Sequence, residues 1–259
     1  MKIRTIIVGG CFTKQHNIES SKLYHQLLGN ELLKNENLEL DLSIIRYERL
    51  TKCLEKVIRS IEEQKPDLIL FHIRPEPLHR ICKLYYVYKD STGKLIRSLN
   101  FGFLNKINTE NQKFKISQNV PATYTYPKES RFHRFLIDCN YLFGMGAGNV
   151  GYGLKLYLNL VTELHQLCIE KGIKLVLIGP VSRPHTLLEN RLAERLDSYF
   201  ETSINSIKIP YVKCIGVRSV ENKWLFGDEG IYVNQVGHKR VAKLIYNSLI
   251  ENNLLNLSR

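Results

Sequence analysis

The sequence predicts an α/β protein: a doubly wound, five-stranded parallel sheet with helices on both faces and a large insertion after the third strand. Short apolar runs of strand length alternate with amphipathic segments of helical period along most of the 259 residues. The third run, 67–73, has few polar interruptions, as in a strand covered on both faces. The same alternation resumes after residue 172, so we expect a single domain, 1–259.

Three strands and two helices are expected in the first part of the chain. In order, they are strand 5–8, helix 21–33, strand 38–45, helix 54–61 and strand 67–73. Gly9-Gly10 stops the first strand, and Pro66 follows the second helix. Because a helix separates consecutive strands, we expect those strands to be parallel.

The pattern changes between residues 78 and 132, where no clean period holds. This stretch contains 10 Lys+Arg, 3 Asp+Glu and nine aromatic residues. We interpret it as a basic, aromatic insertion. Because it follows the third strand, we expect it over the ligand-binding edge of the sheet, in the place of a lid. Interleaved Tyr and Lys/Arg side chains can stack on sugar rings or bases and contact phosphates. The interpretation that we favour for this composition is a small subdomain with its own aromatic core and a solvated basic face.

The last part of the chain returns to regular alternation after a long helical region. The expected elements are a helical region 134–171 broken near 144–151, strand 173–178, helix 186–200, strand 211–215 and helix 235–249. Ligands of such sheets bind at the carboxyl ends of the strands. The residues that follow each strand are therefore the candidates for function.

Composition and charge narrow the classes of function. No run of 18 apolar residues occurs, which argues against a transmembrane helix, and the apolar stretch 5–8 is too short for a signal peptide. The net charge of +12 favours an acidic partner, which is nucleic acid, an anionic membrane face or an anionic glycan, and no nucleic-acid-binding motif is present. The six cysteines are spread without a C-x-x-C pair, which is typical of free thiols in a reducing, cytoplasmic compartment. His and carboxylate residues do not fall at ligand spacing, so we expect no metal and no cofactor.

The loops at the expected strand ends resemble the SGNH/GDSL hydrolase superfamily. The segments that carry the resemblance are 8–13, 66–76, 177–180 and 229–238. The last of them, Glu-Gly-Ile-Tyr-Val-Asn-Gln-Val-Gly-His, is the most specific and is similar to the family's D-G-x-H-x-N-x-x-G-H block. The resemblance implies a flavodoxin-like sheet and an esterase or acylhydrolase activity.

The sequence departs from the family at each position that names it. The nucleophilic serine falls on Cys11, and the asparagine of the third block falls on Glu76. The catalytic histidine falls on Tyr232 and its partner aspartate on Glu229, while no glycine stands at 46–48 for the second block. The fold inference rests on hydrophobic spacing and survives these changes, whereas the activity has to be argued from the residues present.

Cys11 is the candidate nucleophile because it follows a buried strand and precedes a helix, where a thiol pKa can be depressed. The alternative is a small buried thiol. Tyr232 is a poor base at neutral pH, so His185 after the fourth strand is the candidate base. His72 is expected to pack beneath the site, and the counterpart of His238 in the family is mainly structural.

Arg74 and Arg183 follow neighbouring strands and are the candidate anion-binding residues, since a guanidinium suits carboxylate or phosphate. Glu76 can pair with either arginine, and a structural ion pair is the alternative role. Asp228 and Glu229 either orient a base or cap a turn.

Together these residues predict a hydrolase or acyltransferase for acyl esters, with Cys11 as nucleophile and backbone amides nearby as the oxyanion hole. The expected substrate is a small-molecule or glycan ester, anionic in character. The alternative is a non-catalytic protein of the same fold that binds an anionic ligand or glycan in the cleft.

Overall fold

The computed structural model describes residues 1–13, 18–47, 49–78, 85–89, 95–99, 131–146, 149–182, 187–204, 206–217 and 233–255. Its central feature is a five-stranded sheet of order β2-β1-β3-β6-β7, in which every pairing is parallel. The strands are β1 (Lys2–Gly9), β2 (Glu39–Arg46), β3 (Leu68–His72), β6 (Lys174–Ile178) and β7 (Tyr211–Val212). The predicted fold class is confirmed.

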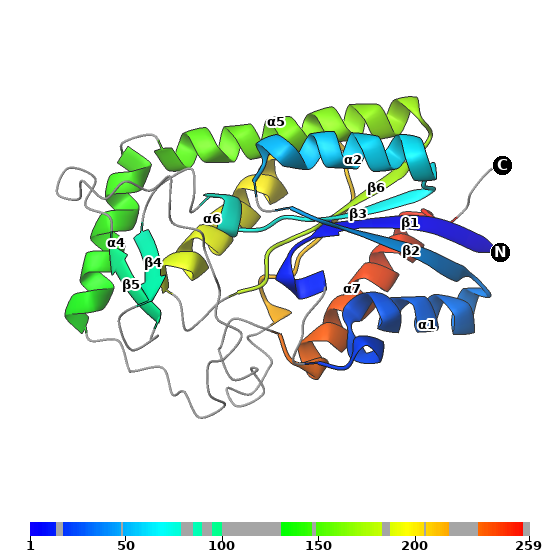
Figure 1. Ribbon diagram of the computed structural model, residues 1–259, viewed down its shortest axis with the longest axis horizontal. Helices are drawn as coiled ribbons and strands as arrows, with labels where there is room; N and C mark the ends of the chain where they lie inside the picture. Colours follow the sequence, from blue (N-terminus) through cyan, green and yellow to red (C-terminus); the bar gives the residue numbers. More distant parts are fainter. Residues whose placement is uncertain are drawn as a thin grey trace.

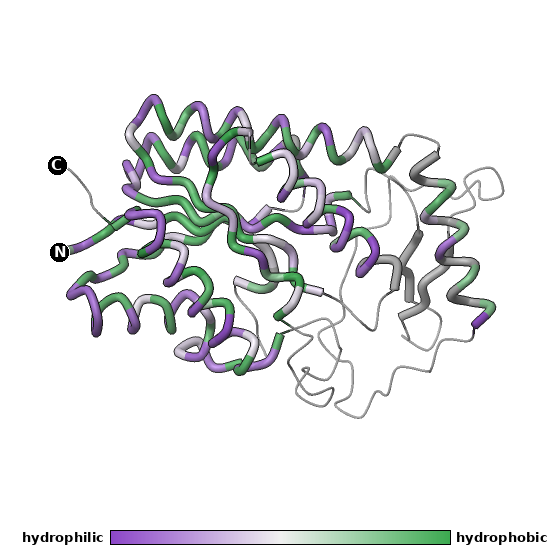
Figure 2. The backbone as a smooth tube through the Cα atoms, turned by 180° about the vertical axis from the view of Figure 1, so that it is seen from behind, coloured by the Kyte–Doolittle hydropathy of each residue, from purple (hydrophilic) through white to green (hydrophobic). Residues whose placement is uncertain are grey.

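Helices cover both faces of the sheet (Figure 1). The helices that pack on the sheet are α1 (Tyr24–Glu36), α2 (Thr51–Gln64), α5 (Asn149–Glu170), α6 (Leu187–Ile204) and α7 (Gln235–Glu251). Helix α4 (Arg131–Gly146) lies beyond the end of the sheet, against α5 and α6 (Figure 1), and η1 (Cys11–Thr13) and η2 (Ser20–Lys22) are short 3-10 turns. One core cluster joins the sheet to α2, α5 and α6, and the other joins it to α1 and α7. Figure 2 shows the strands as a hydrophobic block between helices of mixed hydropathy.

Strand β3 contributes to both cores because its side chains alternate between the two faces. Ile69 and Phe71 pack with α2 and α5, whereas Leu68 and Leu70 pack with α1 and α7. All five residues of β3 are buried, which explains why its sequence has so few polar residues.

The sheet order places a switch point between β1 and β3. The chain runs from β1 to β2 on one side of β1 and then returns to β3 on the other side. Gly9 pairs with Arg46 in β2, and Val8 pairs with Phe71 in β3, so the loops after these strands are neighbours. A ligand of an open α/β sheet binds at such a point.

Two details differ from, or refine, the sequence-based expectations. The helical region 134–171, expected to break near 144–151, is two helices: α4 ends at Gly146 and α5 begins at Asn149. Within the expected insertion, β4 (Tyr85–Lys89) and β5 (Leu95–Leu99) form an antiparallel pair that the sequence pattern did not predict. The remainder of 79–130 lies outside the described residues, and the lid stays a prediction.

Among the helices that are described, none has the length and apolar character needed to cross a membrane.

Candidate functional site

A tight turn follows β1 at the carboxyl edge of the sheet. The Thr13 hydroxyl donates to the Gly10 carbonyl at 2.6 Å, and the Thr13 N–H donates to the same oxygen at 3.1 Å. A Cβ at Gly9 would collide with the Thr13 methyl and lie 3.3 Å from Cδ2 of His72, so glycine is required there. The turn places the backbone of Cys11 at the switch point, while the Cys11 side chain lies outside the described atoms.

Arg74 follows β3 and reaches across to this turn. Its guanidinium lies against the α-carbon of Gly10, where an added Cβ would overlap it. Nη1 donates to the Tyr47 carbonyl, Nε lies 3.3 Å from Oε2 of Glu76, and the guanidinium carbon lies 5.2 Å from the centre of the Tyr47 ring. The Arg74 side chain is only 13% exposed. The structure therefore brings Arg74 and Glu76 together beside the backbone of residues 10 and 11.

Two buried tyrosines fix the backbone under Arg74. The hydroxyl of Tyr157, on α5, accepts the Arg74 N–H at 2.8 Å. The hydroxyl of Tyr47 donates to the His72 carbonyl at 2.6 Å, and the two tyrosine hydroxyls are bonded to each other. Burial raises the pKa of both phenols, so both remain neutral.

The sequence reasoning missed this pair of tyrosines. Tyr47 stands at the position searched for a second-block glycine, and its N–H donates instead to the Gly9 carbonyl at 3.1 Å. Tyr157 lies in a helix that is otherwise apolar where it meets the core. A tyrosine inside an apolar stripe is the one available signal, because its hydroxyl needs a partner once it is buried.

An aromatic cluster lies beneath η1. Phe12 stacks on Tyr24 at 5.0 Å and on His238 at 4.7 Å, measured between ring centres. His72 Nε2 is hydrogen-bonded to the Tyr24 hydroxyl at 2.5 Å, and His238 Nδ1 accepts the Tyr24 N–H at 3.2 Å. The cluster joins η1, β3, α1 and α7 under the site.

Burial lowers the pKa of both His72 and His238 to about 3, so both are neutral at pH 7. A third histidine, His25, is also buried, with Nε2 3.0 Å from the Thr13 carbonyl, and burial lowers its pKa as well. These histidines support the turn from below, as expected for His72 and His238.

The other predicted site residues lie outside the described residues. They are Arg183, His185, Asp228, Glu229 and Tyr232. The neighbouring Ser182 hydroxyl donates to the Ile215 carbonyl, which ties the loop after β6 to the loop after β7. Asn234 caps α7 by accepting the Gly237 N–H at 2.9 Å. Across the described part of the chain, no group of three or more His, Cys, Asp or Glu residues could hold a metal ion.

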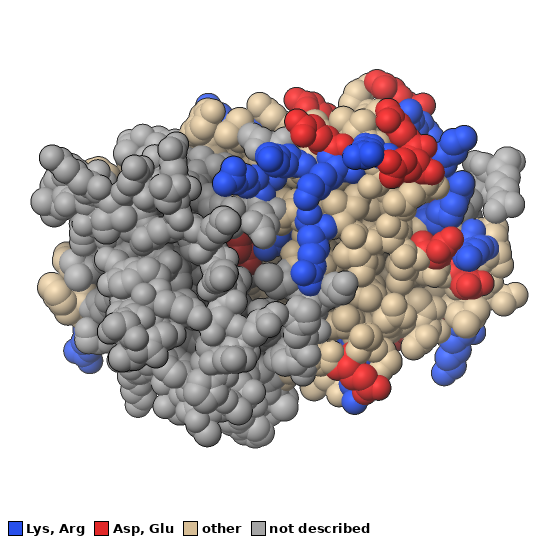
Figure 3. All heavy atoms as spheres, in the orientation of Figure 1, with Lys and Arg blue, Asp and Glu red and all other residues tan. Residues whose placement is uncertain are grey.

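The surface next to Arg74 is basic. Arg46 ends β2, Arg49 follows it, and Lys52 and Lys56 lie in the first turns of α2; all four are exposed. The Lys56 ammonium lies 3.4 Å from the Arg46 carbonyl. Figure 3 shows Lys and Arg side chains gathered over the end of β2 and the start of α2. Glu55 is an exposed acidic residue in the same turns.

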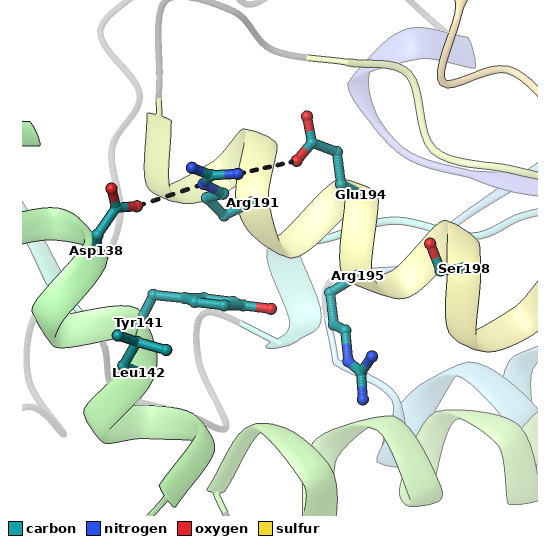
Figure 4. A pocket seen from close by; sticks show the side chains of 7 residues that line it. All are labelled: Asp138, Tyr141, Leu142, Arg191, Glu194, Arg195 and Ser198. Atoms are coloured by element: carbon teal, nitrogen blue, oxygen red, sulfur yellow. Dashed lines mark hydrogen bonds and ion pairs between the residues drawn. The ribbon is translucent and has the colours of Figure 1, made fainter.

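A second feature is an open groove of about 450 Å³ between α4 and α6 (Figure 4). Its lining residues are Asp138, Tyr141, Leu142, Arg191, Glu194, Arg195 and Ser198. Arg191 lies between two carboxylates, with Nε 3.3 Å from Asp138 and Nη1 3.8 Å from Glu194. None of these residues is a predicted site residue.

No family model and no curated protein matches this sequence. Solved structures do match it. A putative lipolytic protein of the G-D-S-L family from Desulfitobacterium hafniense has a TM-score of 0.56 at 9% identity, over 95% of this chain and 99% of its own. TesA has a TM-score of 0.54 at 12% identity, over 95% and 97% of the two chains.

An acetylxylan esterase from Geobacillus stearothermophilus, Axe2, has a TM-score of 0.57 at 9% identity, over 95% of this chain and 94% of its own. Near-complete coverage of both chains means that the likeness extends through the whole sheet and its helices, although identity at this level speaks for the fold alone. The chain therefore has the fold of the SGNH/GDSL hydrolases, as the resemblance in its loops implied.

Proposed function

We propose that this protein hydrolyses or transfers acyl groups of esters, with the Cys11 thiolate as nucleophile. The observation that carries the proposal is the tight turn after β1, which places the Cys11 backbone at the switch point beside Arg74. A sheet shared with esterases and a lipase supports ester chemistry at this point. A thiol can replace a serine hydroxyl as nucleophile if it is deprotonated.

The reaction would run through a thioester. The thiolate attacks the ester carbonyl carbon, and backbone N–H groups near Cys11 stabilise the oxyanion. The C–O bond then breaks, and the alcohol leaves with a proton supplied by the general acid, for which His185 is the candidate. Water or an acceptor hydroxyl attacks the thioester, giving up its proton to the same group, and the thiolate is released. Glu229 and Asp228 would orient the base, and Tyr232 would line the site.

The charge around the turn supports an anionic substrate. A guanidinium beside Gly10 favours both a thiolate at residue 11 and a carboxylate or phosphate on the substrate. The exposed cations Arg46, Arg49, Lys52 and Lys56 raise the local concentration of anions at this edge. Arg183 would add to this binding, and Glu76 would hold Arg74 in place. The acetylxylan esterase neighbours make an acylated glycan a reasonable form for the substrate.

One observation favours a second candidate, a non-catalytic protein that binds an anionic ligand in the same cleft. The histidines packed under the turn are buried, and the pKa of His72 and of His238 is about 3. The described part of the site thus contains a cation for binding and supplies no histidine positioned as a base.

Hydrolysis of 4-nitrophenyl acetate between pH 5 and 9 tests the two candidates. The exposed thiol of Cys139 could react with this ester, so the measurement uses a Cys139→Ala background as its matched control. Turnover that is lost in Cys11→Ala and shifts its pH profile in Cys11→Ser supports the enzyme. Equal background rates in all three proteins, over a panel of anionic and neutral esters, would favour the binding protein.

A further inference from the structure

Helix α4 carries a group of exposed apolar side chains. Its exposed side carries Phe132, Phe135, Leu142 and Phe143, which are 69%, 61%, 65% and 59% exposed. These four residues are called the α4 apolar face. Their spacing of three, ten and eleven residues from Phe132 places them on one side of an α-helix over three turns.

Two half-buried side chains of α4 point the other way, and Leu142 lies between the two sides because it also lines the groove against α6. Asp138 and Tyr141 are half-buried and point toward α6, where Asp138 meets Arg191 (Figure 4). In an ordinary surface helix the apolar stripe would pack on the protein and the acid would face water. Here four apolar side chains of the helix face outward, where a partner can reach them.

The clustering separates this face from ordinary exposed residues. Other exposed large apolar residues are spread singly over other elements, such as Leu33 on α1, Ile169 on α5 and Val236 on α7. Isolated residues of this kind are normal on a protein surface, whereas a contiguous apolar patch marks an interaction site.

Charge identifies the kind of partner. The chain carries a net charge of +12, and the stretch 78–132, which leads directly into α4, holds 10 Lys+Arg against 3 Asp+Glu. Arg131, at the first position of α4, is exposed next to Phe132. Two copies of so basic a chain repel each other, while a bilayer surface that contains anionic lipids attracts it. Phenylalanine and leucine beside cationic side chains are the residues with which interfacial helices enter a bilayer surface.

We propose that the α4 apolar face docks this protein onto the surface of an anionic lipid bilayer, with α4 lying in the plane of the interface. The four apolar side chains enter the boundary between headgroups and acyl chains, and Arg131 contacts the headgroups. This peripheral contact is independent of the ester chemistry proposed above.

Flotation with vesicles tests the proposal on the full chain. The vesicles are phosphatidylcholine alone and phosphatidylcholine with 30% phosphatidylglycerol. We expect binding to the anionic vesicles, weaker binding at 0.5 M NaCl, and at least a tenfold loss of partitioning in Phe135→Ser/Leu142→Ser. The matched control is Leu33→Ser/Ile169→Ser, which removes exposed apolar side chains elsewhere and should bind like the wild type.

A second measurement uses the Cys139 thiol, which is exposed on α4 one turn before Leu142. Anionic vesicles should slow its reaction with a charged maleimide several-fold, as followed by mass spectrometry of the peptide.

Three results would overturn the proposal. The first is equal flotation of the two double variants. The second is a dimer in sedimentation velocity that dissociates in Phe135→Ser/Leu142→Ser, which would assign the face to a second copy. The third is a large loss of thermal stability in that variant without vesicle binding by the wild type, which would show that the chain itself covers the face.

Discussion

The guanidinium of Arg74 lies against the α-carbon of Gly10, so the loop after β3 closes over the loop after β1. Gly10 is needed because any side chain there would occupy the position of the guanidinium. The contact holds a largely buried cation beside the backbone of Cys11, at the point where the strand order reverses. The two adjacent glycines of the turn therefore have different roles, and substitution can separate them.

Gly10→Ala should impair the site more than the fold. The added methyl group meets the end of a flexible side chain, so Arg74 can move aside and the free energy of unfolding should change by less than about 1 kcal/mol. The displaced guanidinium should weaken binding of an anionic ester or ligand about tenfold, with little change for a neutral one. Urea denaturation and binding titrations measure the two effects.

Gly9→Ala provides the contrast. Its methyl group meets the buried Thr13 side chain and approaches His72, neither of which has room to move. We expect this variant to lose about 1–3 kcal/mol of unfolding free energy. If Gly10→Ala proved the more destabilising of the two, the assigned role of Arg74 would be wrong.

Tyr157→Phe should destabilise the protein by about 1–3 kcal/mol, because it leaves the Arg74 N–H without its acceptor in a partly buried position. Tyr47→Phe removes the donor to the His72 carbonyl and the bond to Tyr157. Since the two hydroxyls share one network, the double variant should lose less than the sum of the single losses. Urea denaturation of the wild type, the two single variants and the double variant gives the coupling energy between the two hydroxyls. Strictly additive losses would mean that the hydroxyls act separately.

The fold was predictable because its signals are local. The unbroken apolar run of β3 and the helical spacing of α7 each reflect burial that follows from the residue's own element. The contact of Arg74 with Gly10 and the bond between Tyr47 and Tyr157 join residues far apart in sequence, and no periodic pattern records them. The strands β4 and β5 were missed because a stretch rich in Tyr, Lys and Arg has no clear apolar alternation. The candidate site was only partly predictable: Arg74 and Glu76 do meet beside the turn, whereas the roles of Cys11 and His185 stay predictions.

Acidification should weaken the fold through the buried histidines. The pKa of His72 and of His238 is about 3 in the folded protein, against about 6.5 for an exposed histidine. The unfolded chain therefore binds more protons below pH 6.5, and stability is lost as the pH falls from 6.5 toward 3. Each histidine should contribute a slope of about 1.4 kcal/mol per pH unit in that window.

Urea denaturation at intervals between pH 7.5 and 4.5 measures this slope. His238→Gln keeps a polar side chain without the titration and should make the slope shallower, although its stability at pH 7.5 will also fall. A pH-independent free energy of unfolding between 6.5 and 5 would contradict the burial of these rings in neutral form.

The four thiols that the structure describes should react with alkylating reagents at very different rates. Burial raises the pKa of Cys53 and Cys168 to about 12 and raises that of Cys214 as well, whereas Cys139 is exposed. Because the thiolate is the reactive form, iodoacetamide at pH 7.5 should modify Cys139 readily and the other three only as fast as the protein unfolds. Peptide mapping by mass spectrometry follows each site, and addition of 6 M urea should equalise their rates. A fast reaction at any of the three buried thiols in the native protein would contradict the packing of the two cores.

The rate at Cys11, compared with the rates at these four thiols, reports directly on whether Arg74 lowers the pKa of the Cys11 thiol. Modification well below pH 7 would support Cys11 as the nucleophile, and a rate as slow as that of Cys53 would assign Cys11 a packing role.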